Sequence, residues 1–116
     1  MSRRVVIVVP DLFFVARILT AGKSLGVAID RSSADTLVAD CRRGPPDLVI
    51  VDLHGDGDPL AAIRALRADP LTRGVRVVGF HSHVDTAIRD AALAAGVDEV
   101  LPRSAFTVRL ALLLRG

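Results

Sequence analysis

Two strongly apolar segments constrain the fold of this chain more than any other feature. Residues 5–9 (VVIVV) and 47–53 (DLVIVDL) are rich in β-branched side chains and lack the polar alternation of a half-exposed strand. Continuous runs of this kind are typical of strands that are buried on both faces of a parallel sheet. The chain is therefore expected to cover both faces of its sheet with helices.

Helical patterns and shorter strands alternate with these two runs. Further strands are expected at 27–29, 75–80 and 97–101. Helices are expected at 11–25, from a Ser32 or Ser33 cap to 43, from an Asp58 cap to 68, at about 85–95, and from a Ser104 cap to 114. Each helix must return the chain to the same end of the sheet. The pattern predicts one α/β domain over 1–116, with three layers, a five-stranded parallel sheet and five helices.

Composition excludes several classes of protein. Hydrophobic residues make up 51% of the chain and charged residues 24%, which excludes a disordered chain. The net charge is +2 and the arginines are scattered, so nucleic-acid binding is not expected. Residues 5–9 are too few for a signal-peptide core or a membrane span, and no membrane association is expected. Cys41 is the single cysteine, which fits a cytoplasmic location.

Polar and reactive side chains follow four of the predicted strands. They are Pro10-Asp11, Asp52 with His54, His81-Ser82-His83, and Pro102-Arg103-Ser104. In open parallel sheets, ligands bind beyond the carboxyl ends of the strands. The sequence therefore predicts a functional site at this edge.

The order of these segments resembles the response-regulator receiver (CheY-like) family over nearly the whole chain. The resemblance rests on DLVIVDL, IRALRADPLTRGVRVVGF and ALAAGVDEVLPRSAF. PDLFF, GFHSH and LPRSAF are similar to an atypical stand-alone receiver subfamily. The family implies a flavodoxin-like fold with strand order 2-1-3-4-5.

The resemblance assigns expected roles to the edge residues. Asp52 matches the phosphoacceptor, and Asp11 matches the second of two acidic residues that hold Mg²⁺ in the family. Pro10 replaces the first, so we expect weakened Mg²⁺ binding by Asp11, Asp52 and the backbone carbonyl of His54.

Two further positions of the family pattern are altered. The fourth strand of a receiver ends in a Ser or Thr; counting back from Gly96 gives His81, whereas a loop shorter by one residue gives Ser82. Arg103 stands where the family has Lys, and we expect it to face Asp52 across a shared cavity. Ser104 replaces a proline that follows a cis bond, and Pro102 precedes the cation instead.

Other interpretations of the edge residues remain open. His54, His81 and His83 could bind a transition metal together with Asp11 or Asp52, although their spacing matches no zinc motif. Asp56 and Asp58 are expected to shape a turn. Phe13, near the same edge, either contacts a partner or folds over the pocket.

The leading hypothesis is a single-domain receiver in two-component or phosphorelay signalling, and not an enzyme. Its expected partners are a histidine kinase or phosphotransfer protein and a downstream effector, because only Arg115-Gly116 follow the last helix. A homodimer through the fourth helix, fifth strand and fifth helix is a further option. The alternative is a phosphorylation-independent pseudo-receiver that acts as an interaction or dimerisation module. A third class is a small enzyme or ligand-binding domain that uses the histidines.

Overall fold

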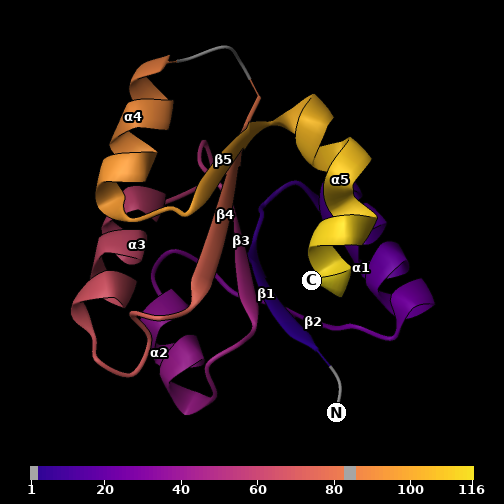
Figure 1. Ribbon diagram of the computed structural model, residues 1–116, viewed down its shortest axis with the longest axis horizontal. Helices are drawn as coiled ribbons and strands as arrows, with labels where there is room; N and C mark the ends of the chain where they lie inside the picture. The colour runs from indigo at the N-terminus through magenta and orange to yellow at the C-terminus, as the bar shows by residue number, and fades with distance from the viewer. Residues whose placement is uncertain (1–2, 83–85) are drawn as a thin grey trace.

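The computed structural model describes residues 3–82 and 86–116, and within them a parallel five-stranded sheet has the order β2-β1-β3-β4-β5. The strands are β1 (Arg4–Val8), β2 (Ala28–Arg31), β3 (Leu48–Asp52), β4 (Arg76–His81) and β5 (Glu99–Pro102). The helices are α1 (Leu12–Leu25), α2 (Leu37–Arg43), α3 (Pro59–Ala68), α4 (Thr86–Ala95) and α5 (Arg103–Arg115) (Figure 1). The predicted fold class and strand order are confirmed.

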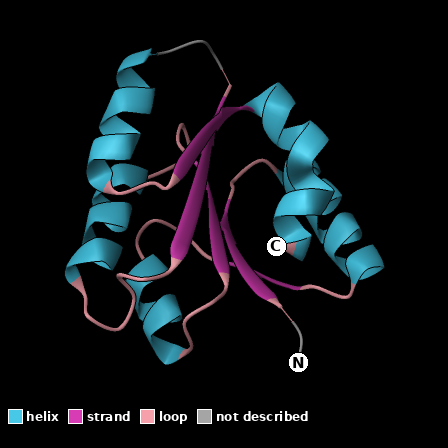
Figure 2. Ribbon diagram, in the orientation of Figure 1, coloured by secondary structure: helices cyan, strands magenta, loops and turns pink. Residues whose placement is uncertain are grey.

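Helices cover both faces of the sheet, as the two apolar runs predict. Figure 2 shows α2, α3 and α4 on one face and α1 and α5 on the other. Successive residues of β1 alternate between the two cores: Val6 and Val8 lie under α2, α3 and α4, whereas Val5 and Ile7 lie under α1 and α5. Both cores need apolar side chains, which explains why the strand sequence shows no polar alternation.

The predicted start of the second helix is wrong by several residues. Ser33 and Thr36 bond to each other through their hydroxyls at 2.9 Å, and the Ser32 hydroxyl donates to the Asp40 carboxylate at 2.6 Å. These bonds shape a turn before α2, and the side chain of the N-cap residue Thr36 makes no capping hydrogen bond to the helix backbone. Serine hydroxyls favour turns and caps alike, so their sequence position alone could not distinguish the two.

The predicted start of the fifth helix is wrong in the opposite direction, because this helix begins earlier than predicted. Pro102 is its N-cap, no side chain caps it, and Arg103 is its first residue, so the predicted Ser104 cap is wrong. The caps at Asp11 and Asp58 are present and accept backbone N–H groups of α1 and α3. The predicted start of the fourth helix at Asp85 lies outside the described residues.

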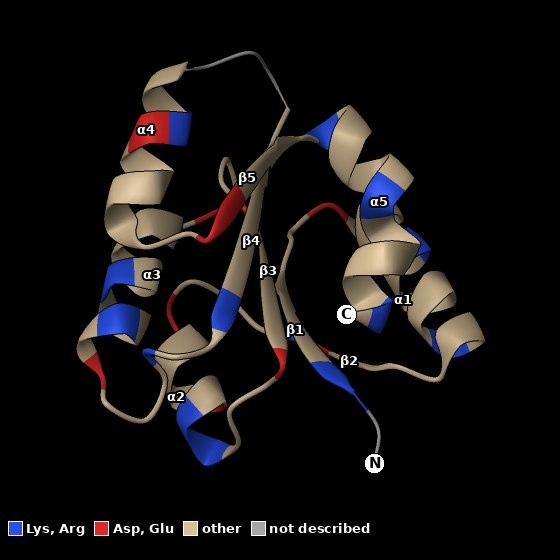
Figure 3. Cartoon of the chain, viewed as in Figure 1, with Lys and Arg blue, Asp and Glu red and all other residues tan. Residues whose placement is uncertain are grey.

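Among the described residues, no helix combines the length and the apolar character needed to cross a bilayer. Figure 3 shows cationic positions spread over several strands and helices, without one continuous basic stripe.

Candidate functional site

The carboxyl ends of the strands bring the predicted residues to one edge of the sheet, uppermost in Figure 1. Asp52 ends β3 and is in register with Phe80 of β4, while His81 is in register with Pro102 of β5. Arg103 follows directly. We call Asp11, Asp52, His54, His81 and Arg103 the sheet-edge site.

Asp52 is a nearly buried carboxylate with a defined orientation. It is 7% exposed, and its Oδ1 accepts the backbone N–H of His54 at 2.9 Å. The backbone N–H of Leu53 donates to the carbonyl of Phe80 at 2.9 Å, which extends the β3–β4 pairing one residue beyond the strand. The backbone of the loop after β3 therefore fixes the orientation of the Asp52 carboxylate.

Both carboxylate oxygens of Asp11 are engaged. Oδ1 accepts the backbone N–H groups of Phe13 at 3.0 Å and Phe14 at 3.3 Å, which caps α1. Oδ2 lies 3.0 Å from Nη2 of Arg103. The Arg103 guanidinium is the main cause that lowers the pKa of Asp11, and the N–H of Phe14 adds to it. Asp11 is therefore held as an anion at the start of α1.

Arg103 is positioned by an aromatic cluster as well as by Asp11. Its guanidinium carbon lies 4.2 Å from the ring centroid of Phe14 and 6.0 Å from that of Phe80. Phe80 in turn stacks on Phe106 at 4.7 Å. A guanidinium over an aromatic face is attracted by the ring quadrupole, so the rings orient Arg103 toward α1.

This arrangement differs from the predicted one. We expected Arg103 to face Asp52 across a shared cavity, but the salt bridge that it makes within residues 3–82 and 86–116 is with Asp11, and the cleft that it lines with Asp11 does not include Asp52. The physical reason is the position of α5: Arg103 is its first residue, and α5 packs beside α1 on the face that carries the phenylalanines. Arg103 reaches the carboxylate that caps its neighbouring helix.

His81 and Ser82, the two candidates for the position at which the fourth strand of a receiver ends in Ser or Thr, lie in different environments. His81 is the last residue of β4 and is 7% exposed, whereas Ser82 follows the strand and is exposed. His83, which belongs to the predicted transition-metal group, lies outside the described residues. Among the residues that the structure describes, no group of three or more His, Cys, Asp or Glu side chains could hold a metal ion.

A cleft beside the sheet-edge site separates the first turns of α1 and α5. Its volume is about 450 Å³, and we call it the α1–α5 cleft. It is lined by Asp11, Phe13, Phe14, Arg17, Arg103, Ser104 and Thr107. Phe13 is 92% exposed, so it does not fold over the site.

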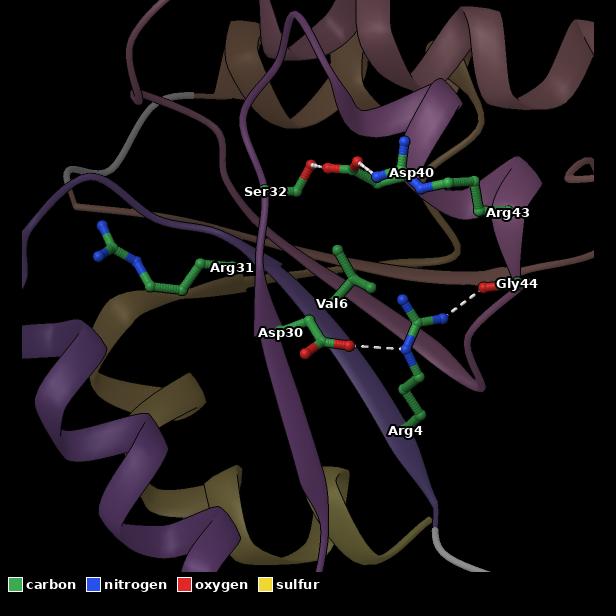
Figure 4. Close-up of a pocket in the computed structure, with 8 residues that line it drawn as sticks. All are labelled: Arg4, Val6, Asp30, Arg31, Ser32, Asp40, Arg43 and Gly44. Atoms are coloured by element: carbon green, nitrogen blue, oxygen red, sulfur yellow. Dashed lines mark hydrogen bonds and ion pairs between the residues drawn. The ribbon is translucent and has the colours of Figure 1, made fainter.

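A separate cavity of about 540 Å³ lies between α2 and β2, an edge strand of the sheet (Figure 4). The Nε of Arg4 lies 2.7 Å from Oδ2 of Asp30, and Arg4 also donates to the carbonyl of Gly44. Asp40 accepts from Ser32 and pairs with Arg43. The Ser32 hydroxyl is the main cause that lowers the pKa of Asp40. These charges satisfy one another and stabilise the packing of α2.

The contact of Phe14 with Arg103 was not predicted from the sequence. Phe14 is a core residue of α1 and is 6% exposed. Its second role, as the surface on which Arg103 rests, depends on two helices that are far apart in sequence. The one sequence signal was that Phe14, Phe80 and Phe106 are three of only four phenylalanines.

Comparison with known proteins extends this description. No protein-family profile matches the chain, and no curated protein matches its sequence. Solved structures do match. A protein described as a response regulator from Chloroflexus aurantiacus has a TM-score of 0.88 at 19% identity, with 99% of this chain and 96% of that chain covered.

Two further structures show the same likeness. The receiver domain of a sensor histidine kinase from Pseudomonas aeruginosa, with a magnesium ion in its active-site cleft, has a TM-score of 0.86 at 20% identity, covering 99% of this chain and 96% of that one. A chemotaxis response regulator of Vibrio cholerae has a TM-score of 0.86 at 12% identity, covering 99% and 98%. The chain thus has the fold of CheY-like response-regulator receiver domains over nearly its whole length.

Proposed function

We propose that this chain is a receiver-type signalling domain that acts through protein–protein contacts and works without phosphoryl transfer. The observation that carries the proposal is the ion pair between Arg103 and Asp11. Phosphoryl transfer depends on cations placed to neutralise the incoming oxygens. Here the cation that corresponds to the family's lysine is engaged with Asp11 and with the Phe14 ring.

The residues at the sheet-edge site fit a bound Mg²⁺ poorly. Mg²⁺ requires oxygen ligands in near-octahedral geometry and is usually held by one or two carboxylates. Pro10 offers no carboxylate, and Asp11 already gives one oxygen to the amides of α1 and the other to Arg103. Asp52 and the backbone carbonyl of His54 remain as candidate ligands. We therefore place no step of the function on a metal ion.

The second candidate function is phosphorylation at Asp52. It is favoured by the position of Asp52 at the carboxyl end of β3, where the His54 amide fixes one carboxylate oxygen. A phosphoryl group would add about one and a half to two negative charges. In this alternative Arg103 would leave Asp11 for the new charge, with His81 or Ser82 beside it and weakly bound Mg²⁺ as cofactor. A histidine kinase or a phosphotransfer protein would supply the phosphoryl group.

The expected partners are proteins, and one surface supports contact with them. Leu12 is 67% exposed and Phe13 is 92% exposed at the start of α1, next to the α1–α5 cleft. Exposed aromatic side chains are enriched at protein interfaces. A homodimer formed through α4, β5 and α5 is a second kind of protein contact that we propose. We further propose that the protein acts in the cytoplasm.

Incubation with acetyl phosphate and Mg²⁺, followed by intact-mass measurement, distinguishes the two functions. We expect no phosphoryl adduct on the wild-type chain or on Asp52→Ala, each compared with its own untreated mass. A receiver domain with both acidic residues serves as the positive control for the reagent. A single phosphoryl adduct on the wild type that is absent from Asp52→Ala would overturn the proposal and establish the second candidate.

A further inference from the structure

We propose that Arg103 is the resident counter-cation of Asp11, and that its guanidinium keeps divalent metal ions out of the sheet-edge site. This inference rests on the proposed function and names the residue responsible for it. Removing the charge of Arg103 is then expected to create a divalent-cation site that the wild-type chain lacks.

Both carboxylate oxygens of Asp11 are already occupied. Its Oδ2 lies 3.0 Å from Nη2 of Arg103, and its Oδ1 accepts two backbone N–H groups of α1. A divalent cation at this carboxylate would have to displace the guanidinium or sit next to it. The second arrangement places two cationic groups within a few ångströms of each other, which is unfavourable.

Arg103 also changes the net charge that the two carboxylates present. Asp11 and Asp52 contribute two negative charges and Arg103 one positive charge, which leaves a net charge of −1 from these three residues. Without Arg103 the same two carboxylates carry a net charge of −2. Two carboxylates are the larger of the one or two that usually hold Mg²⁺ in proteins, and a charge of −2 attracts a divalent cation more strongly than a charge of −1.

Arg103 is held in place by contacts of both its side chain and its backbone. Its guanidinium rests 4.2 Å from the Phe14 centroid, and its backbone is fixed as the first residue of α5. Its carbonyl accepts the Thr107 hydroxyl at 2.9 Å, within the first turn of that helix. Arg differs from Lys in having a planar group that stacks on an aromatic face while donating to a carboxylate. These contacts explain how a surface cation, 34% exposed, holds one position.

Divalent-ion titration followed by ¹H–¹⁵N NMR tests the proposal. We compare the wild type with Arg103→Gln, which keeps a polar but shorter and uncharged side chain, and with Arg103→Ala. Millimolar Mg²⁺ should leave the amides near Asp11 and Asp52 unshifted in the wild type and should shift them in both variants. We expect the apparent Kd to fall by about tenfold or more, the order expected when one charge next to an ionic group is removed. Mn²⁺ should broaden the same amides.

Two controls make the outcome specific. Arg17→Ala removes another cation of the α1–α5 cleft, which makes no ion pair among the described residues, and should leave the titration unchanged. Asp11→Asn combined with Arg103→Gln should abolish the gained binding. Circular dichroism reports whether each variant is folded.

The possible results separate cleanly. Equal Mg²⁺ affinity in the wild type and in a folded Arg103 variant overturns the inference, whether both bind or neither does. A different measurement tests the proposed function: a phosphoryl adduct on Asp52 would contradict it. An adduct on the wild type without Mg²⁺ would overturn the function and leave the exclusion of metal by Arg103 standing.

Discussion

The guanidinium carbon of Arg103 lies 4.2 Å from the ring centroid of Phe14, so that a core side chain of α1 supports a cation of α5. Phe14 also packs edge-on against Phe80, with the ring centroids 5.2 Å apart. The ring therefore has an apolar neighbour on the sheet and a charged neighbour at the surface.

Replacing the Phe14 ring by a leucine side chain should weaken its contacts with both Phe80 and Arg103. We expect Phe14→Leu to lower the free energy of unfolding by about 1–2 kcal/mol, because each aromatic pair contributes about 0.5–1.5 kcal/mol beyond burial. The matched control is Phe13→Leu, which alters an adjacent ring that is 92% exposed and should change stability by less than about 0.5 kcal/mol. Urea unfolding of the two variants provides the comparison. Equal losses would show that the Phe14 ring contacts contribute little.

The ionisation of Asp11 should report its pairing with Arg103. The pKa of Asp11 in the folded protein is lowered, so its stabilising contribution is present above the unfolded pKa and is lost as the pH falls through the folded pKa. A ¹³C NMR titration should give Asp11 a midpoint below its ordinary value. Arg103→Gln should raise that midpoint, although the N–H of Phe14 still lowers it. An unchanged midpoint in the variant would contradict the ion pair in solution.

Arg67 should be the arginine whose loss costs most stability. It donates to the carbonyls of Arg73 at 2.7 Å, Val75 at 2.6 Å and Gly96 at 2.9 Å, and it lies 2.9 Å from the Asp98 carboxylate. It thereby joins α3 to the ends of β4 and α4. Arg67→Ala leaves these acceptors without their donor, and we expect a loss of about 1–3 kcal/mol.

The matched control for Arg67 is Arg64→Ala on the same helix. Arg64 is exposed and makes no ion pair in the described parts of the chain, so its removal should change stability by less than about 0.5 kcal/mol. Thermal and urea unfolding both measure the difference. If the two variants lost the same stability, the bonds of Arg67 would not be the cause.

Asp58, which caps α3, allows the contribution of the loop after β3 to stability to be measured. Its Oδ1 accepts the backbone N–H of Ala61 at 3.0 Å, at the first turn of α3. Asp58→Ala should lower the free energy of unfolding by about 1 kcal/mol. Asp56→Ala removes an exposed carboxylate two residues earlier that caps no helix, and it should have a much smaller effect in the same urea experiment. A larger loss from Asp56→Ala would reverse the assignment.

The sequence by itself determined the layers of this protein. Residues 5–9 and 48–52 had to be buried on both sides, because a continuous β-branched run leaves no polar face for solvent. The alternation of strands and helices then required a parallel sheet, and a parallel sheet required Asp52, His81 and Arg103 to meet at one edge. These conclusions depend on local patterns and on chain connectivity, which sequence records directly.

Only the tertiary structure decided which of these charges pair. Arg103 follows β5, and from the sequence both Asp11 and Asp52 were within reach of its long side chain. The packing of α5 beside α1 and the Phe14 ring between them directed the guanidinium to Asp11. An ion pair depends on distances of a few ångströms between residues about ninety positions apart, and no local pattern specifies such a distance.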